Sequence, residues 1–216
     1  MNAIIVTGGD IDIALLENYI AENKEDVIIS VDAAITKLEK INVIPDVMVG
    51  DFDTLADDEM LKKYAKFQVE IVRHDPIKDF SDSELAVDRA IGEGIRKIAV
   101  FGALGKRFDH AFANILILQK YKKLGVDITI YDKYNKIYVK SNHFTLEKEK
   151  LWGKYISFFS LEGKNFMEKL EGVKYHIENR IIDNIATPSL YISNEIKGDK
   201  IEATFSGYLL VVESRD

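Results

Sequence analysis

Aspartates stand after several predicted strands in the first half of the chain. Asp32 follows the second strand, and Asp51 and Asp53 follow the third. Asp82 follows the fourth strand and opens the next predicted helix. Ligands of an open α/β sheet bind beyond the carboxyl ends of its strands, so we expect these carboxylates to converge there. Converging carboxylates need a cation, and Mg²⁺ binds a few carboxylates together with substrate phosphates. The pattern therefore predicts a magnesium and phosphate site.

The spacing of two of these acids favours a shared ion. Asp51 and Asp53 are two residues apart, so in extended backbone both side chains point to the same side. A polar turn that ends the strand is an alternative interpretation of this pair. Asp82 has an alternative too, because an acid in the first turn of a helix favours the helix dipole without any ligand. Neither alternative explains why acids recur at successive strand ends.

A glycine-rich and basic segment, 102–107 (GALGKR), precedes another predicted helix. It lacks the Walker pattern of a phosphate loop. Arg107 can still neutralise a transferred phosphate, because a guanidinium binds phosphate oxygens with two parallel hydrogen bonds. Asp109 and His110 either serve this site or cap the helix that follows. The turn at Gly8-Gly9-Asp10 is a weaker signal of the same kind.

Composition excludes several classes of site and partner. The chain has no cysteine and four scattered histidines, so disulfides, thiolate nucleophiles and Cys-based or His-rich zinc sites are not expected. The formal net charge of −7 argues against nucleic acid as a partner. No stretch approaches the roughly 20 apolar residues that span a bilayer. We expect a cytoplasmic protein without a membrane partner, whose metal ligands are oxygens.

Two rhythms of hydrophobicity predict the elements that position these residues. Up to residue 132, short β-branched runs alternate with amphipathic stretches, which predicts βαβ units around a mainly parallel sheet. The expected fold class is α/β, with a three-layer α/β/α nucleotide domain at 1–132. Ser81 and Glu84 form a capping box at one helix start. The expected strands are 3–7, 27–31, 47–50, 69–72, 97–101 and 127–131, and the expected helices are 11–23, 33–40, 57–64, 82–92 and 110–124.

From residue 133 onward helical periodicity largely disappears. Short alternating runs separated by Gly or Asn-Glu turns predict a small antiparallel β-sandwich or barrel at 133–216. No Pro- or Gly-rich linker marks the boundary, so packed domains are expected rather than tethered ones. The expected strands include the runs 136–139, 155–159, 190–193, 200–205 and 208–212.

Taken together, these motifs resemble the thiamine pyrophosphokinase family in order and spacing across nearly the whole chain. Each matching piece is short, but their shared order makes coincidence a poor explanation. The segments that carry the resemblance are 30–34 (SVDAA), 45–46 (PD), 50–54 (GDFDT), 78–82 (KDFSD), 105–110 (GKRFDH) with Asn114 after it, 172–175 (GVKY) and 193–195 (SNE).

The resemblance implies an activity and an assembly. It implies transfer of a diphosphate from ATP to the hydroxyl of thiamine, giving AMP and thiamine diphosphate, in a homodimer with the active site between subunits. The implied roles are Mg²⁺ binding and catalysis by Asp51, Asp53 and Asp82, catalysis and ATP binding by Arg107, further ATP binding by Asp32, Lys78, Asp79, Asp109 and His110, and thiamine binding by Ser193, Asn194 and Tyr175.

The sequence departs from the family pattern at Leu85, where many members carry Lys. Lys78 or Lys106 is the candidate to replace a phosphate contact there. Two other functions are considered: a pyrophosphokinase for another alcohol, such as a hydroxymethylpterin, and a nucleotide-binding regulatory module without turnover. A purely structural protein leaves the ordered acids unexplained. The sequence does not assign the general base.

Overall fold

The computed structural model describes residues 1–52, 58–74, 80–105 and 107–216, and the chain divides into two compact units. The first unit comprises residues 1–117 and 124–133, and the second comprises 118–123 and 134–216. The domain boundary expected between residues 132 and 133 stays a prediction. No helix among the described residues is long and apolar enough to cross a membrane.

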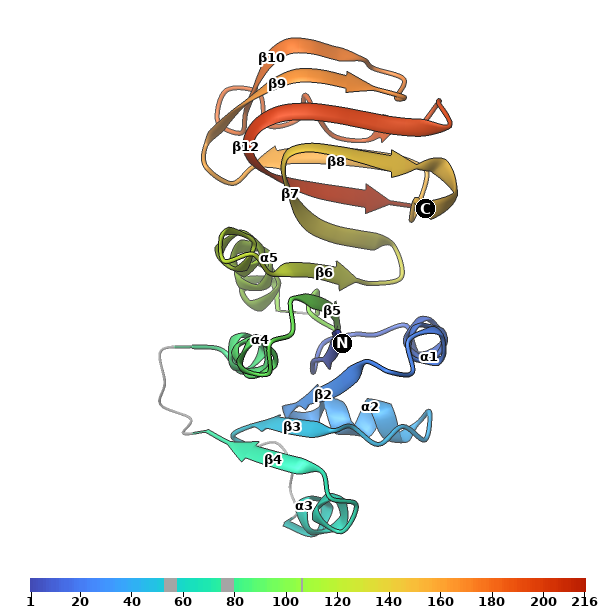
Figure 1. Ribbon diagram of the computed structural model, residues 1–216, viewed down its shortest axis with the longest axis vertical. Coiled ribbons are helices and arrows are strands. Elements are labelled where there is room, and N and C mark those ends of the chain that lie inside the picture. Colours follow the sequence, from blue (N-terminus) through green and yellow to red (C-terminus); the bar gives the residue numbers. More distant parts are fainter. Residues whose placement is uncertain (53–57, 75–79, 106) are drawn as a thin grey trace. The chain divides into compact units, whose positions relative to one another are not determined.

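The first unit is built on a parallel sheet with strand order β6-β5-β1-β2-β3-β4 (Figure 1). The central strands β1 and β3 are buried at every residue, which is why their sequences are continuous apolar runs. The strands are β1 (Ala3–Val6), β2 (Val27–Val31), β3 (Val47–Gly50), β4 (Glu70–Arg73), β5 (Lys97–Phe101) and β6 (Asp127–Tyr131).

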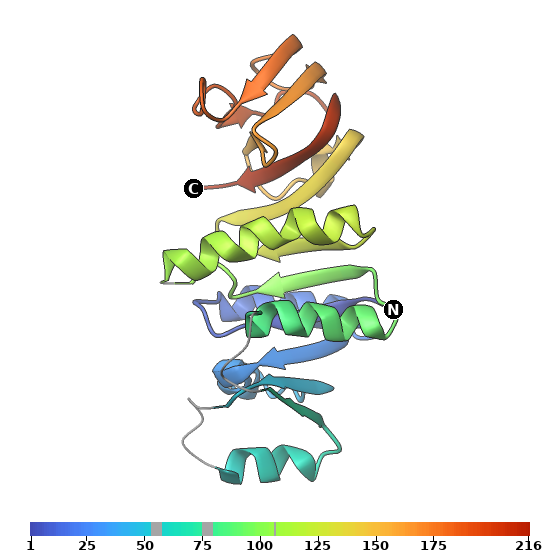
Figure 2. The ribbon, with the colours of Figure 1, turned by 90° about the vertical axis from the view of Figure 1, so that its left-hand side faces the viewer.

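Helices cover both faces of this sheet and give the unit its three layers. Leu16, Leu38 and Tyr64 bring α1, α2 and α3 into one buried cluster with strand residues. Figure 2 looks onto the opposite face, which α4 (green) covers by contacts with β1, β2 and β3. The helices are α1 (Ile13–Glu22), the 3₁₀ turn η1 (Asp32–Ala34), α2 (Ile35–Glu39), α3 (Asp58–Ala65), α4 (Asp82–Gly92) and α5 (Phe108–Lys123).

The second unit is an antiparallel β structure organised around its longest strand, β12. β12 pairs with β9 through its first part and with β8 through its second part, and it pairs with β7 on both sides of a register irregularity between Thr204 and Tyr208. The elements are β7 (Asn135–Glu147), η2 (Lys148–Lys150), β8 (Tyr155–Ser160), β9 (Lys164–Glu171), β10 (Ile177–Asp183), β11 (Asn194–Glu195) and β12 (Lys200–Ser214).

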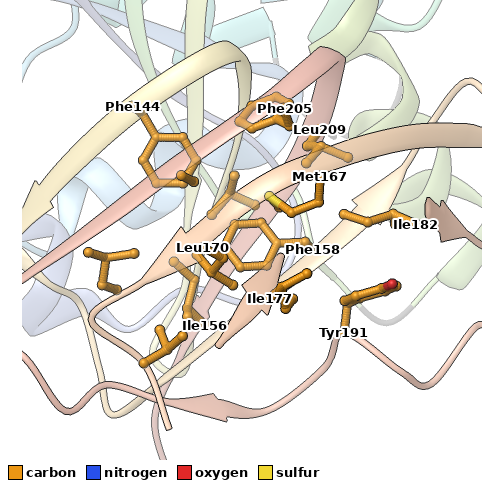
Figure 3. Packing of buried hydrophobic residues seen from close by; sticks show 14 of the residues in the cluster. Phe144, Ile156, Phe158, Met167, Leu170, Ile177, Ile182, Tyr191, Phe205 and Leu209 are labelled. Atoms are coloured by element: carbon orange, nitrogen blue, oxygen red, sulfur yellow. The ribbon is translucent and has the colours of Figure 1, made fainter. Parts of the chain in front are cut away.

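Side chains from the inner faces of these strands form one apolar core (Figure 3). Phe158 and Met167 are almost wholly buried in it, and Phe144 lies edge-on to Phe205 with ring centroids 6.0 Å apart. Buried and exposed residues alternate along β9 from Lys164 to Glu168, and Leu170 is the next buried residue.

The predicted fold class is confirmed, because a mainly parallel α/β sheet is followed by antiparallel strands. Two expectations in the second half were wrong. Residues 190–193 are a turn rather than a strand, and the paired residues are Asn194–Glu195. The runs 200–205 and 208–212 belong to one strand, because the expected turn between them is the irregularity in β12.

Candidate active site

A cavity of about 470 Å³ lies at the carboxyl ends of the strands in the first unit. Its walls come from the loops after β1, β2 and β5 and from the starts of α4 and α5. The chain thus brings together segments that are up to 107 residues apart in the sequence. The lining residues are Thr7, Gly8, Gly9, Asp10, Val31, Asp32, Ser81, Asp82, Ser83, Gly102, Ala103, Gly105, Arg107, His110 and Asn114.

Two glycine loops touch each other in the wall of this cavity. A Cβ atom on Gly9 would collide with the carbonyl oxygen of Gly102 and lie 2.9 Å from the Cα of Gly105. A Cβ atom on Gly105 would in turn lie 2.8 Å from the Cα of Gly9. The loops after β1 and β5 can therefore meet backbone to backbone because Gly9 and Gly105 have no side chain at the contact.

The carboxylate of Asp32 is held close to the backbone of the neighbouring strand. Asp32 has φ of 49°, a left-handed conformation that is uncommon for residues other than glycine. A Cβ atom on Gly50, at the end of β3, would collide with the carboxylate of Asp32. Gly50 thus leaves room for Asp32, which accounts for the glycine before the Asp51 and Asp53 motif.

Helix capping fixes the position of Asp82. The hydroxyl of Ser81 accepts a hydrogen bond of 3.3 Å from the backbone N–H of Glu84, as expected from the capping box. Asp82 is consequently the first residue of α4 and lines the cavity, as do Asp10 and Asp32. Three aspartates from three different loops therefore line one cavity. The sequence predicts such a convergence of carboxylates at the strand ends.

The start of α5 carries an exposed ion pair. Arg107 donates to Asp109 through Nη2 at 2.6 Å and through Nε at 3.2 Å. This pairing lowers the pKa of Asp109 to about 2 and raises the pKa of Arg107. Arg107 and His110 line the cavity, whereas Asp109 is not among its lining residues. In this arrangement Asp109 orients the guanidinium of Arg107 rather than facing the cavity.

The expected magnesium ligands are placed incompletely. Asp51 follows β3 and is half-buried, but it is not among the residues that line the cavity. Asp53, Lys78 and Asp79 lie outside the described residues. Within the ranges that the structure describes, no three His, Asp or Glu side chains are grouped closely enough to hold a metal ion. The set Asp51, Asp53 and Asp82 therefore stays a prediction.

A second hollow, of about 560 Å³, lies in the second unit. Tyr175 and Asn194, both expected to bind thiamine, line this hollow, and the Tyr175 side chain is largely exposed. Ser193 is exposed and does not line it. The lining residues are Tyr175, His176, Ile177, Glu178, Arg180, Leu190, Tyr191, Ile192 and Asn194.

The side chain of Asn194 is already engaged within the protein. Its Nδ2 donates to the carbonyl of Tyr175 at 2.8 Å, and its Oδ1 accepts from the N–H of Tyr175 at 2.9 Å. Asn194 is 5% exposed. This two-way clamp fixes the backbone of Tyr175, so Asn194 shapes the hollow as well as lining it. An amide has one further hydrogen and one further lone pair for a ligand.

Sequence reasoning missed residues that hold the loops of the first cavity. Asn114 donates from Nδ2 to the carbonyl of Ala103 at 2.9 Å and ties α5 to the loop after β5. Lys37, on α2, donates to the loop after β1. A lysine in the last turn of a helix is common on protein surfaces, so its type and position gave no signal. The matched motif that ends in Asn114 was a signal for that residue.

The fold and the site define a class of protein. Glycine loops before helices, at the carboxyl edge of a parallel sheet, are typical of domains that bind nucleotide phosphates. The acids beside them suit a bound divalent cation that accompanies those phosphates. The first unit therefore has the fold and the loop arrangement that are typical of α/β nucleotide-binding domains.

Comparison with known proteins identifies the family. Residues 19–130 match the model of the thiamin pyrophosphokinase catalytic domain, and residues 141–210 match that of the thiamin pyrophosphokinase vitamin B1 binding domain. A thiamine pyrophosphokinase of Bacillus subtilis is 31% identical over 190 residues, which are 87% of each chain. The chain belongs to the thiamin pyrophosphokinase family.

Solved structures agree in fold over the full length of the chain. The crystal structure of thiamine pyrophosphokinase from Bacillus subtilis has a TM-score of 0.85 and 28% identity, covering 100% of both chains. That of the thiamin pyrophosphokinase from Geobacillus thermodenitrificans has the same TM-score and identity, covering 100% of this chain and 98% of the other. Both units are therefore shared with these relatives.

Proposed function

We propose that this enzyme, an ATP-dependent diphosphotransferase that acts on thiamine, binds the phosphates of ATP in the cavity of the first unit. The observation that carries the proposal is the meeting of two glycine loops, three carboxylates, Arg107 and His110 around one cavity of about 470 Å³. Backbone N–H groups of such loops and of helix starts are suitable partners for phosphate oxygens.

The donor set fits Mg²⁺, which the family resemblance implies. Asp32 and Asp82 offer hard oxygen ligands from two neighbouring loops, and Asp10 lies on the same cavity. The metal ligands that we propose are Asp51, Asp53 and Asp82. Asp51 and Asp53 follow β3 in the sequence. When bound, the ion would neutralise phosphate charge and align the phosphate chain.

The remaining side chains orient and neutralise the triphosphate. In the reaction, the hydroxyl oxygen of thiamine forms a bond to the β-phosphorus, and the bond from that phosphorus to the bridging α,β-oxygen breaks. AMP is the leaving group. Because such a transfer needs little covalent chemistry from the protein, catalysis consists chiefly of aligning the reacting groups and neutralising phosphate charge. Arg107, held by Asp109, binds oxygens of the transferred group, His110 contacts the nucleotide, and Lys78 and Asp79 bind ATP.

We assign thiamine to the hollow of the second unit. The hollow lies within the segment that matches the vitamin B1 binding domain. Tyr175 offers an aromatic face, which attracts cations such as the thiazolium ring, and Glu178 and Arg180 bring one charge of each sign to the lining. Asn194 holds Tyr175 in place, and Ser193 and the free positions of the Asn194 amide would bond the aminopyrimidine edge.

Product analysis tests the proposed activity. Purified protein with ATP, Mg²⁺ and thiamine is expected to form AMP and thiamine diphosphate in equal amounts, and chelation of Mg²⁺ should stop the reaction. Release of ADP with thiamine monophosphate would reject diphosphate transfer. A hydroxymethylpterin is the control acceptor, and turnover of it without turnover of thiamine would assign the protein to another acceptor.

We further propose a homodimer in which each active site uses both subunits, as the family resemblance implies. A mixing experiment tests this assembly. One variant, Asp82→Asn, lacks one of the carboxylates that line the first cavity. The other variant, Tyr175→Ala, lacks the aromatic ring of Tyr175 in the second hollow. If subunits share sites, an equimolar mixture of the two variants regains up to about a quarter of wild-type activity, because about half of its dimers are mixed and each mixed dimer has one intact site. Absence of recovery after verified subunit exchange would refute shared sites.

The cytoplasm is the proposed location, because the reaction consumes ATP. Fractionation of cells of the source species, with an antibody to the protein, checks this assignment. Recovery of the protein in an exported or membrane fraction would contradict it.

A further inference from the structure

Lys37 joins a helix to the loop that forms one side of the nucleotide cavity. Its Nζ donates to the carbonyl oxygen of Thr7 at 3.3 Å and also to the carbonyl oxygen of Gly9. Thr7 and Gly9 line the cavity, whereas Lys37 itself is not among the lining residues. Lys37 therefore binds the loop without lining the cavity that is proposed for the ligand.

The loop that Lys37 holds is packed against the second glycine loop. Gly9 is in backbone contact with Gly105, and the carbonyl oxygen of Gly102 occupies the place where a side chain of Gly9 would stand. Asn114 holds the second loop by its bond to Ala103. Lys37 thus holds one of the paired loops from α2, and Asn114 holds the other from α5.

The position of Lys37 is energetically demanding, which argues against an incidental contact. The side chain is half-buried, and burial lowers the pKa of its ammonium, while nearby Asp10 opposes that shift. Removing an ammonium from water is unfavourable unless hydrogen bonds compensate. The two loop carbonyls supply that compensation, and bonds to a charged donor are stronger than those between neutral groups.

We propose that Lys37 is a positioning residue for nucleotide binding, which sets the conformation of the loop 7–9 by binding its carbonyls. The proposal rests on the proposed ATP site in the first unit. With both carbonyls turned toward Lys37, the loop presents its other side to the cavity. Without the ammonium, the loop is less ordered in the ligand-free protein. Ordering it when the nucleotide binds then costs conformational entropy, which lowers the nucleotide affinity.

Substitutions at Lys37 test this role. Lys37→Met keeps most of the aliphatic stem and removes the donor, and Lys37→Arg keeps a cation that can donate. Lys40, exposed at the end of the same helix, provides the matched control Lys40→Met. The measurements are the affinity for a non-hydrolysable ATP analogue with Mg²⁺, the thiamine affinity, kcat, KM for ATP and a melting curve.

The expected result separates positioning from general stability. Lys37→Met should weaken binding of the ATP analogue and raise KM for ATP by about tenfold, the size expected from losing hydrogen bonds of a charged donor. Thiamine affinity should not change. Lys37→Arg should recover most of the affinity, and Lys40→Met should bind as the wild type does. In NMR spectra of ligand-free protein, the amide signals of Gly8 and Gly9 should shift in Lys37→Met.

Other outcomes decide against the inference. A folded Lys37→Met protein with a lowered melting point but unchanged ATP affinity would give Lys37 a purely structural role. If that variant does not fold, Lys37→Gln, which can donate to one carbonyl, provides the comparison, and wild-type affinity in it overturns the proposal. Failure of the wild-type protein to bind the ATP analogue would instead refute the proposed nucleotide site.

Discussion

The two hollows proposed to bind ATP and thiamine are built in different ways. Around the first, glycine loops are in backbone contact, and helix starts supply carboxylates and a guanidinium. Around the second, side chains of β10 and of the turn before β11 make the walls, and Asn194 clamps the backbone of Tyr175. Phosphates are recognised well by backbone N–H groups and charge, whereas an organic ring needs shaped side chains.

Because the two sites are built differently, different substitutions should impair them. The first should fail when a carboxylate is lost or when a side chain is forced between its loops. The second should fail by loss of shape around Tyr175, with the first unit unaffected. Substitutions that impair one hollow alone would confirm that the two sites are independent, and substitutions that impair both alike would contradict it.

The largest effect is expected from Asp82→Asn. The amide keeps the size of the side chain but loses the charge on the cavity, so kcat should fall about 100-fold or more, as when one electrostatic contribution to a transition state is removed. Asp88→Asn, an exposed position on the same helix, is the matched control. Steady-state kinetics and circular dichroism measure turnover and folding. Near-normal turnover in folded Asp82→Asn would remove Asp82 from the catalytic site.

Gly9→Ala should have the next largest effect, on stability and ATP affinity together. The added methyl group would collide with the carbonyl oxygen of Gly102, and overpacking of this kind costs about 1–3 kcal/mol of unfolding free energy. Gly8→Ala is the control, because among the described residues no heavy atom other than those of its chain neighbours lies within 4 Å of a Cβ atom at Gly8. Urea unfolding compares the two variants. Equal stability of both would contradict the backbone contact between the loops.

Asn194→Ala should act on the second hollow alone. The substitution removes the two hydrogen bonds to the backbone N–H and carbonyl of Tyr175, and each such bond contributes about 0.5–1.5 kcal/mol. We expect thiamine affinity to fall about tenfold while affinity for an ATP analogue stays unchanged. Calorimetric titrations with each ligand, together with a melting curve, make the measurement. Unchanged thiamine affinity in a stable variant would exclude a role in substrate binding.

The smallest effect concerns the acid stability of the second unit. Asp183 accepts hydrogen bonds of 2.9 Å from the N–H groups of Ile185 and Ala186 and pairs with Lys164, and these contacts lower its pKa to about 2. Because the folded pKa lies below the ordinary value, its contribution is present above about pH 4 and disappears as the pH falls through about 2.

Asp183→Asn tests this contribution. The variant should be less stable than the wild type at neutral pH, and the difference should shrink between pH 4 and pH 2. Urea unfolding at several pH values gives the difference in unfolding free energy. A difference that does not depend on pH would show that the turn after β10 does not depend on the charge of Asp183.

Most of the first unit could be predicted from the sequence because its elements are local and strongly patterned. The runs 27–31, 47–50, 97–101 and 127–131 and the helix 82–92 were predicted with the bounds that the structure has. In the second unit β9 and β10 were not predicted, and 190–193 was assigned to a strand. Pairing in antiparallel sheets depends on distant partners, so propensity alone placed these elements poorly.

The parts of the candidate site that could be predicted are those in which the residue types alone indicate a function. Asp32, Asp82, Arg107 and His110 line one cavity, as expected from acids and a basic loop at successive strand ends. The role of Lys37 was not predicted, because the sequence does not indicate which distant backbone carbonyls a lysine on a helix binds. The engagement of Asn194 with Tyr175 likewise depends on a contact between segments 19 residues apart.

The place of β12 in the second unit has a consequence for biosynthesis. This strand follows β7, β8 and β9 in the chain and pairs with all three. A ribosome therefore completes those three strands before their common partner exists, and their apolar faces stay without a closed core during that interval. The parallel sheet of the first unit, whose strands all precede β7, has no such dependence on the last strand made. Nascent chains should thus acquire protease resistance in two stages, and the second stage should await β12.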